Sequence, residues 1–171
     1  HFLKRKLRHT SPSIKIIAYK ALIRPKLEYA DLVWVPYKKY LIKKIERIQN
    51  LALRFIYSSY SHFASVSALR EKANLKTLPH RRIVSRLKFI YQLYHDHFKI
   101  PPNRYITNPS VRFDRIHHNK TITQPFSHLN AHQYSLFPHA LSLWNKLPQE
   151  VTIADTTQSF SHLVNDLTLD F

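Results

Sequence analysis

Apolar residues recur at helical spacing through most of the first hundred positions. The clearest pattern lies between Tyr37 and Tyr57, where apolar side chains step by four or three residues and so share one helix face. These side chains are Leu41, Ile45, Ile48, Ala52 and Phe55. Four basic side chains project towards the opposite side of the same helix. They are Lys39, Lys43, Arg47 and Arg54. The pattern predicts a helix with an apolar stripe and a basic stripe back to back.

Shorter helices are expected before this one. Ser11 followed by Pro12 is typical of a helix start, and the helix should run to about Arg24. Pro25 should then end or kink it, because proline cannot donate the backbone hydrogen bond. A second short helix is expected over residues 27–34.

Two further helices are expected before residue 100. Ser65 can cap a helix that runs through Ala73, with Asn74 as its stop. Pro79 begins a longer helix that reaches about His97 and has apolar residues on more than one face. This second helix should therefore pack on more than one side.

After residue 100 the sequence changes to short stretches rich in His, Asn, Ser and Thr. Residues 104–134 are predicted to form an extended loop region, with short strands around 105–106 and 121–122. Helices are expected near 140–146 and over 157–167. The predicted fold class is mainly α, with three parts. They are a small helical bundle over residues 1–60, connecting helices over 61–99, and a loop-rich C-terminal extension with short helices over 100–171.

Composition changes this picture chiefly through charge. The 171 residues include 27 Lys and Arg but 10 Asp and Glu, and the pI is near 10.2. Residues 1–60 carry a net charge of +11, residues 61–120 carry +9, and residues 121–171 carry −3. Such a balance favours a polyanionic partner for the first two thirds, with nucleic acid as the first candidate and an anionic membrane surface as the second.

Several kinds of chemistry are excluded by residues that the chain lacks. It has no Cys, so disulfides, thiolate zinc sites and cysteine nucleophiles cannot form, and we expect an intracellular protein of the nucleus or cytoplasm. It has no Gly, which excludes a Walker loop and a G-x-G-x-x-G turn. The chain starts at His1 and has no Met, so we expect it to be a piece of a longer open reading frame.

Candidate catalytic and metal-binding residues are weak. The stretch from Tyr29 to Leu32 reads Y-A-D-L, one residue from the Y-A-D-D turn of polymerases. Two-metal polymerase chemistry needs an adjacent Asp pair and a third carboxylate upstream, and no acidic residue precedes Glu28. Asp31 is therefore interpreted as an ordinary surface residue, and no catalytic residue is assigned.

Twelve histidines invite a metal-site hypothesis. The pairs are His95 with His97, His117 with His118, and His128 with His132. The last pair has the spacing that could bind zinc on a helix, but no neighbouring Glu or Cys completes a site. We interpret the histidines as scattered surface residues and expect no metal or cofactor in this chain.

The basic stripe is the stronger signal. Glu46 is the one acidic residue between Lys38 and Arg54, so the stripe lacks the acids that usually balance a solvated face. Two more basic clusters lie at residues 3–8 (LKRKLR) and 80–88 (HRRIVSRLK), which gives three basic clusters interleaved along the chain with Tyr and Phe. Binding to a phosphate backbone without base readout is therefore favoured. A second contact zone is predicted at Arg81, Arg82, Arg86 and Lys88.

Two motifs resemble one known family. Residues 18–37 (AYKALIRPKLEYADLVWVPY) with 41–56 (LIKKIERIQNLALRFI) resemble the region after the catalytic palm in reverse transcriptases of non-LTR, LINE-type retrotransposons. Residues 137–151 (FPHALSLWNKLPQEV) followed by SFSHL resemble the closing segment of the same polyproteins, and residues 75–95 resemble the helix that joins the two. The resemblance covers nearly the whole chain, with its motifs in the right order.

The resemblance implies a non-catalytic role. Residues 1–60 would be the thumb, a helical bundle that holds the template and the nascent strand, and the rest a C-terminal extension. The parent would be a magnesium-dependent RNA-directed DNA polymerase. This chain lacks its catalytic Asp pair and should be inactive alone. Its partners would be RNA or an RNA/DNA hybrid and the missing palm and fingers, without a membrane. The alternatives are a free-standing basic helical nucleic-acid-binding module or, third, a helical protein that binds anionic membranes.

Overall fold

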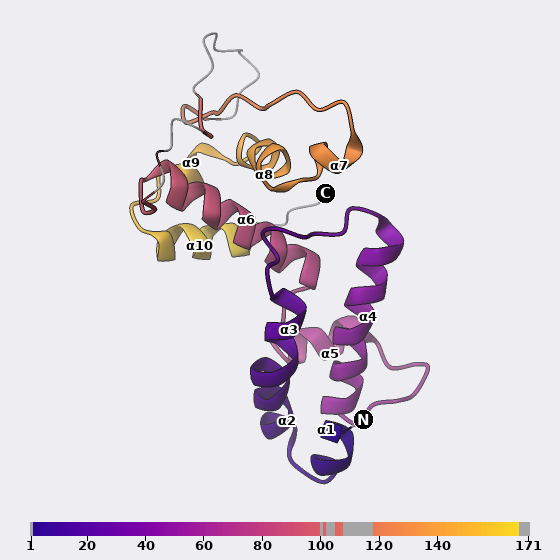
Figure 1. Cartoon of the computed structure of the whole chain (residues 1–171). Helices are drawn as coiled ribbons and strands as arrows, with labels where there is room; N and C mark the ends of the chain where they lie inside the picture. The colour runs from indigo at the N-terminus through magenta and orange to yellow at the C-terminus, as the bar shows by residue number, and fades with distance from the viewer. Residues whose placement is uncertain (1, 100, 102–104, 108–117, 168–171) are drawn as a thin grey trace. The chain divides into compact units, whose positions relative to one another are not determined.

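The computed structural model describes residues 2–99, 101, 105–107 and 118–167 (Figure 1). These described residues are mainly helical and include no strand, which confirms the predicted mainly-α fold. The chain divides into two compact units. Unit 1 comprises His1–Asp31 and Pro36–Pro79, and unit 2 comprises Leu32–Val35 and His80–Phe171. The predicted connecting part, 61–99, is thus shared between the two units.

The N-terminal helices of unit 1 follow one another without a break at Pro25. Helix α1 is Phe2–Lys6, α2 is Pro12–Ala18, the π-helical segment η1 is Tyr19–Ile23, and α3 is Arg24–Glu28. Pro25 lies in the first turn of α3 and has no N–H to donate. The preceding turn widens, so that the Arg24 N–H bonds to the Tyr19 carbonyl, five residues back. The proline is accommodated by a π turn, and the helical path continues.

The short helix predicted over 27–34 does not form. Helix α3 ends at Glu28, and Ala30 follows with φ of 51°, in the left-handed region. The Asp31 N–H donates to the Glu28 carbonyl at 3.2 Å, so the chain turns here. The polymerase-like tetrapeptide is therefore a helix-ending turn, and Asp31 is half-buried.

Helix α4, Lys39–Ile56, confirms the longest predicted helix within two residues at each end. Its buried residues are Gln49, Leu53 and Ile56, each one position after a member of the predicted apolar stripe. One residue corresponds to a rotation of roughly 100° around the helix. Leu53 and Ile56 share a core with Tyr19, Ala73 and Leu75. The face of α4 that is buried deepest is therefore the one that packs against these three residues.

Helices α5 (Val66–Lys72) and α6 (Leu78–Tyr94) begin and end close to the predicted positions. The Ser65 hydroxyl accepts from the Ala68 N–H at 3.4 Å, the expected N-cap bond. Asn74 stops α5 with φ of 47°, and the Leu75 N–H donates to the Arg70 carbonyl at 3.1 Å. This pattern is a Schellman motif, in which asparagine takes the position that glycine usually occupies.

Unit 2 builds a core from α6 and the C-terminal helices. These are α7 (Asn130–Gln133), α8 (Leu136–Trp144), α9 (Gln149–Thr152) and α10 (Thr157–Asp166). Trp144 and Phe160 are fully buried together with Leu87 and Ile90 of α6. Trp144 and Phe160 thus pack within their own unit, whereas Phe126 is 80% exposed.

The predicted strands around 105–106 and 121–122 are not formed. The chain there is irregular, although the Thr123 N–H donates to the Thr107 carbonyl at 2.8 Å. Irregular backbone continues from 118 to 129, as the predicted loop region requires. Residues 104 and 108–117 of that predicted region lie outside the described residues.

Candidate nucleic-acid interface

The predicted basic stripe of α4 lies in unit 1 and is largely open to solvent. Lys39, Lys43 and Arg47 are exposed. Arg54 is half-buried, and its guanidinium donates to the Ser61 carbonyl at 2.9 Å. Arg54 therefore fixes the segment after α4, and three of the four predicted cations remain as an exposed face. We call Lys39, Lys43 and Arg47 the α4 basic face.

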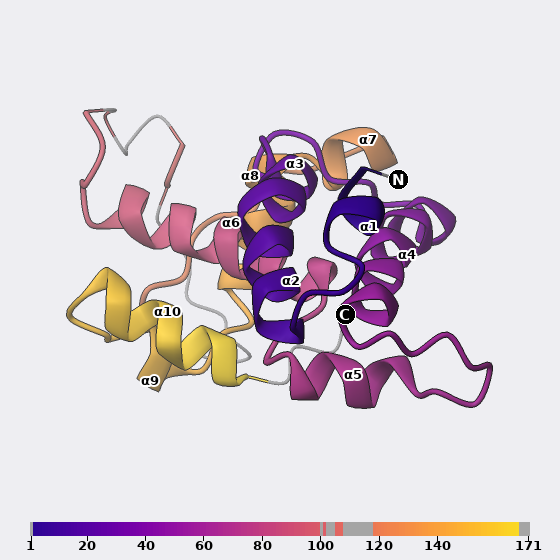
Figure 2. The ribbon, with the colours of Figure 1, turned by 90° about the horizontal axis from the view of Figure 1, so that it is seen from below.

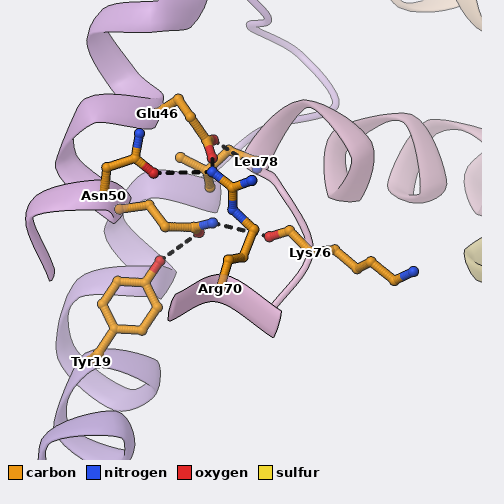
Figure 3. Close-up of polar contacts among 7 residues, drawn as sticks. Tyr19, Glu46, Asn50, Arg70, Lys76 and Leu78 are labelled. Carbon is orange, nitrogen blue, oxygen red and sulfur yellow. Dashed lines mark hydrogen bonds and ion pairs between the residues drawn. The ribbon is translucent and has the colours of Figure 1, made fainter. Parts of the chain in front are cut away.

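The carboxylate of Glu46, the single acid of this helix, is engaged within unit 1. Glu46 Oε1 accepts from the Arg70 guanidinium at 3.2 Å, and Glu46 Oε2 accepts from the Leu78 N–H at 2.9 Å (Figure 3). Asn50 Oδ1 accepts from the same guanidinium at 3.1 Å. The Leu78 N–H is at the N-terminus of α6, where a carboxylate is favourable because the first N–H groups have no partner within the helix. The charge of Glu46 is therefore used inside unit 1.

A second polar contact fixes the rotation of α4. The Tyr19 hydroxyl donates to Gln49 Oε1 at 2.8 Å, and Gln49 Nε2 donates to the Lys76 carbonyl at 3.1 Å (Figure 3). Tyr19 and Gln49 are buried, at 2% and 0% exposure. A buried amide demands such partners, so this contact is specific to one rotation of the helix. That rotation keeps the α4 basic face towards solvent.

The second predicted contact zone, on α6 in unit 2, is divided by burial. Arg82 and Arg86 are 4% and 2% exposed and lie four residues apart, on one helix face. The Arg82 guanidinium lies 5.0 Å from the centre of the Trp34 ring, a cation–π contact. Burial takes both guanidinium groups out of the predicted contact zone. Arg81 is half-buried and Lys88 is exposed, and their spacing of seven puts them on one face.

Arg86 is held by a histidine from α8. Its guanidinium lies 2.6 Å from His139 Nδ1 and 3.4 Å from the Tyr134 carbonyl. Because arginine can only donate, His139 Nδ1 accepts, and the imidazole is neutral. Burial, with the charges of Arg86 and Lys146, lowers the pKa of His139 to about 4. Arg86 and His139 therefore join α6 to α8.

Two basic and aromatic groupings were not assigned from the sequence. Tyr40 is 55% exposed, and the Lys44 ammonium lies 5.7 Å from the centre of its ring. The N-terminal cluster over residues 3–8 borders a pocket that also receives Lys15 and Tyr60. Sequence spacing could have found the first, since Tyr40 and Lys44 are four residues apart on one helix. It could not have found the second, because the residues come from three separated segments.

The histidines and Asp31 form no metal centre in the part of the chain that is described. There, no three His, Asp or Glu side chains lie close enough together to hold a metal ion. His118 is a core residue, with Nε2 2.9 Å from the Trp144 carbonyl and Nδ1 accepting from the Lys120 N–H at 3.2 Å. His132 Nδ1 lies 2.8 Å from the Ser127 hydroxyl. His117, the partner proposed for His118, lies outside the described residues. These residues do not fit a two-magnesium site.

Comparison of the chain with models of known protein families, with curated proteins and with solved structures finds no match. Among the described helices, none is both long enough and apolar enough to cross a membrane.

Proposed function

We propose that this chain is the thumb and C-terminal region of a non-LTR retrotransposon reverse transcriptase. In this proposal it is a non-catalytic part that holds the RNA template or an RNA/DNA hybrid by its phosphate backbone. The α4 basic face would make the principal contacts, with Arg81 and Lys88 as a second zone. Magnesium and the catalytic carboxylates would belong to the palm of the parent polymerase. The sequence resemblance over residues 18–56 and 137–163 supports the family part of this proposal.

The observation that carries the binding part is the isolation of positive charge on α4. Lys39, Lys43 and Arg47 are exposed, while Glu46 is engaged by Arg70 and the start of α6. Exposed cations that lie close together repel one another. Phosphates of a nucleic acid remove this repulsion when they bind, and the nucleic acid then releases its condensed counterions. Backbone contact of this kind positions a nucleic acid without reading its sequence.

The test is the salt dependence of hybrid binding by the full chain. A triple variant, Lys39→Gln, Lys43→Gln and Arg47→Gln, should reduce the slope of log K against log salt by about 2 to 3, at about 0.9 for each duplex phosphate contact. A control with the same charge change is Lys20→Gln, Lys26→Gln and Lys72→Gln, three exposed lysines of unit 1. The control should leave the slope within about 1 of the parent chain.

Equal slopes for the two triple variants would refute the α4 basic face as the contact surface. Polymerisation above background by the isolated chain would contradict the non-catalytic assignment. The retrotransposon origin is tested separately by the coding sequence upstream of His1, which should encode a Y-A-D-D or F-A-D-D turn. If that turn is absent while hybrid binding holds, a free-standing nucleic-acid-binding module becomes the better assignment. Tight binding to anionic vesicles without oligonucleotide binding would favour the membrane alternative.

A further inference from the structure

Unit 1 holds a second concentration of positive charge, which lines an open pocket of about 760 Å³. In Figures 1 and 2, α1 lies beside α2 and the C-terminal part of α4. The pocket is lined by residues of these three helices and of the segments that follow α1 and α4. Its lining residues are Lys4, Arg5, Arg8, His9, Lys15, Phe55, Ser58 and Tyr60. None of these residues is acidic, and four carry a permanent positive charge. The pocket therefore favours an anion.

Lys15 is the most informative of these residues because it is buried, at 4% exposure. Its ammonium lies 3.4 Å from the Ser58 hydroxyl and 4.9 Å from the centre of the Phe55 ring. The Ser58 hydroxyl and the Phe55 ring are both neutral, although removing an ammonium from water is costly without an opposite charge. A phosphate entering the pocket would provide that charge next to a cation already held in place. The buried lysine makes this a formed anion site, in contrast to the open face of α4.

The pocket also offers an aromatic surface. The Tyr60 side chain is 59% exposed, and the Lys4 ammonium lies 5.8 Å from the centre of its ring. Phe55 contributes a second ring to the lining. The volume falls within the range of roughly 300 to 1,000 Å³ that is usual for organic ligands, and it exceeds what inorganic phosphate alone would fill. Cations beside exposed rings are the combination that binds a sugar-phosphate chain with unstacked bases.

We propose that this pocket binds one nucleotide unit of a single-stranded nucleic acid. The phosphate meets Lys15 and the cations of the N-terminal cluster, and the base stacks on Tyr60. In a duplex or hybrid the bases are stacked inside the helix, so only a single strand can present a base to the ring. The inference deepens the proposed function, because it adds a site for a single-stranded extension to a face that holds a duplex.

The experiment compares two labelled probes, a single-stranded RNA of twelve nucleotides and a blunt RNA/DNA hybrid of equal length, on the full chain. Lys15→Met keeps the buried stem and removes the charge. Tyr60→Ala removes the ring, and each base stacked on an aromatic ring contributes about 1 to 3 kcal/mol, so single-strand affinity should fall at least about fivefold. Lys26→Met is the matched control for lysine, since Lys26 is exposed and lines neither the pocket nor the α4 basic face.

We expect Lys15→Met and Tyr60→Ala to weaken single-strand binding and to leave hybrid binding nearly unchanged. Arg8→Ala is added because Arg8 is exposed and its loss should not disturb folding. If neither Arg8→Ala nor Tyr60→Ala lowers single-strand affinity, the pocket proposal is overturned, whatever happens at α4.

The two proposals can fail separately. If the pocket variants lose single-strand binding, the pocket proposal is upheld. If the α4 triple variant nevertheless binds the hybrid as well as the parent chain does, the α4 basic face is refuted as the contact surface. A third probe distinguishes lipid headgroups from nucleic acid. If Arg8→Ala and Lys15→Met abolish binding to phosphatidylserine vesicles while oligonucleotide binding is unaffected, the single-strand assignment is wrong.

Discussion

Ala30→Gly should stabilise unit 1, although Ala→Gly substitutions in helices usually destabilise. Ala30 is exposed, lies in the turn after α3, and has φ of 51°. For an L-residue the left-handed conformation costs roughly 1 to 2 kcal/mol, because Cβ approaches the following carbonyl oxygen. Glycine has no Cβ but loses about 0.5 to 1 kcal/mol more backbone entropy on folding. The net expectation is a gain of about 0.5 to 1 kcal/mol in the free energy of unfolding.

The matched control is Ala21→Gly in the same unit. Ala21 is also exposed, but it lies within η1, where the backbone is right-handed. There glycine relieves no strain and costs about 1 kcal/mol in helix propensity. The two substitutions remove the same methyl group, so their opposite signs isolate the backbone conformation at residue 30.

The assay is urea unfolding followed by far-ultraviolet circular dichroism, which reports all helices. Trp34 and Trp144 both belong to unit 2, so tryptophan fluorescence follows that unit separately. Ala30→Gly should raise the midpoint of the dichroism transition attributable to unit 1, and Ala21→Gly should lower it. If both variants are destabilised to the same degree, residue 30 is not left-handed in solution and the turn after α3 is wrongly described.

Two further predictions concern the polar contacts. Glu46→Ala should lower the free energy of unfolding by about 2 to 4 kcal/mol, because it removes charge-assisted hydrogen bonds to Arg70 and the Leu78 N–H. The control is Glu71→Ala, at an exposed position, which should lower it by under about 0.5 kcal/mol. Urea unfolding checks both variants, and equal costs would mean that the Glu46 contacts are open to water. Because the pKa of His139 is lowered to about 4, the unfolded chain binds more protons between pH 6.5 and 4. Stability should therefore fall as pH drops through this window, by about 1 to 2 kcal/mol after solvent screening, and His139→Gln should flatten the profile.

Local signals in the sequence predicted the helices well. Helix α5 begins after Ser65 and stops at Asn74, as expected. Both signals are local, because a hydroxyl cap and a left-handed asparagine affect only backbone groups a few residues away. At Pro25 the same local reasoning predicted that the helix ends or kinks. Instead, a single π turn accommodates the proline, which has no N–H, and the helical path continues. At residues 27–34 the apolar spacing suggested a helix, while the turn at Ala30 ends it first. Periodicity therefore located the elements better than it located their ends.

The candidate site was harder to predict, because exposure depends on residues far along the chain. Arg82 and Arg86 look like Lys88 in the sequence, yet both are buried, one at the Trp34 ring and the other against His139. Nothing near α6 in the sequence signals those partners. The exposed face of α4 could be predicted, since its cations share one helix and one spacing. The burial of Glu46 against Arg70 could not, because it depends on how α5 packs.

The distribution of charge along the chain corresponds to what each part contributes to the fold. Residues 121–171 carry a net charge of −3 and supply Ile122, Trp144 and Phe160 to the core of unit 2. Among the exposed cations of unit 1, Lys39, Lys43 and Arg47 form the α4 basic face, and Lys4, Arg5 and Arg8 line the pocket of Lys15. No acidic residue is among the residues that define either place. Such gatherings destabilise a compact unit through repulsion, so they are best explained by a partner that neutralises them. A phosphate chain relieves both at once, because its charges recur along its length as the cations do along the helix.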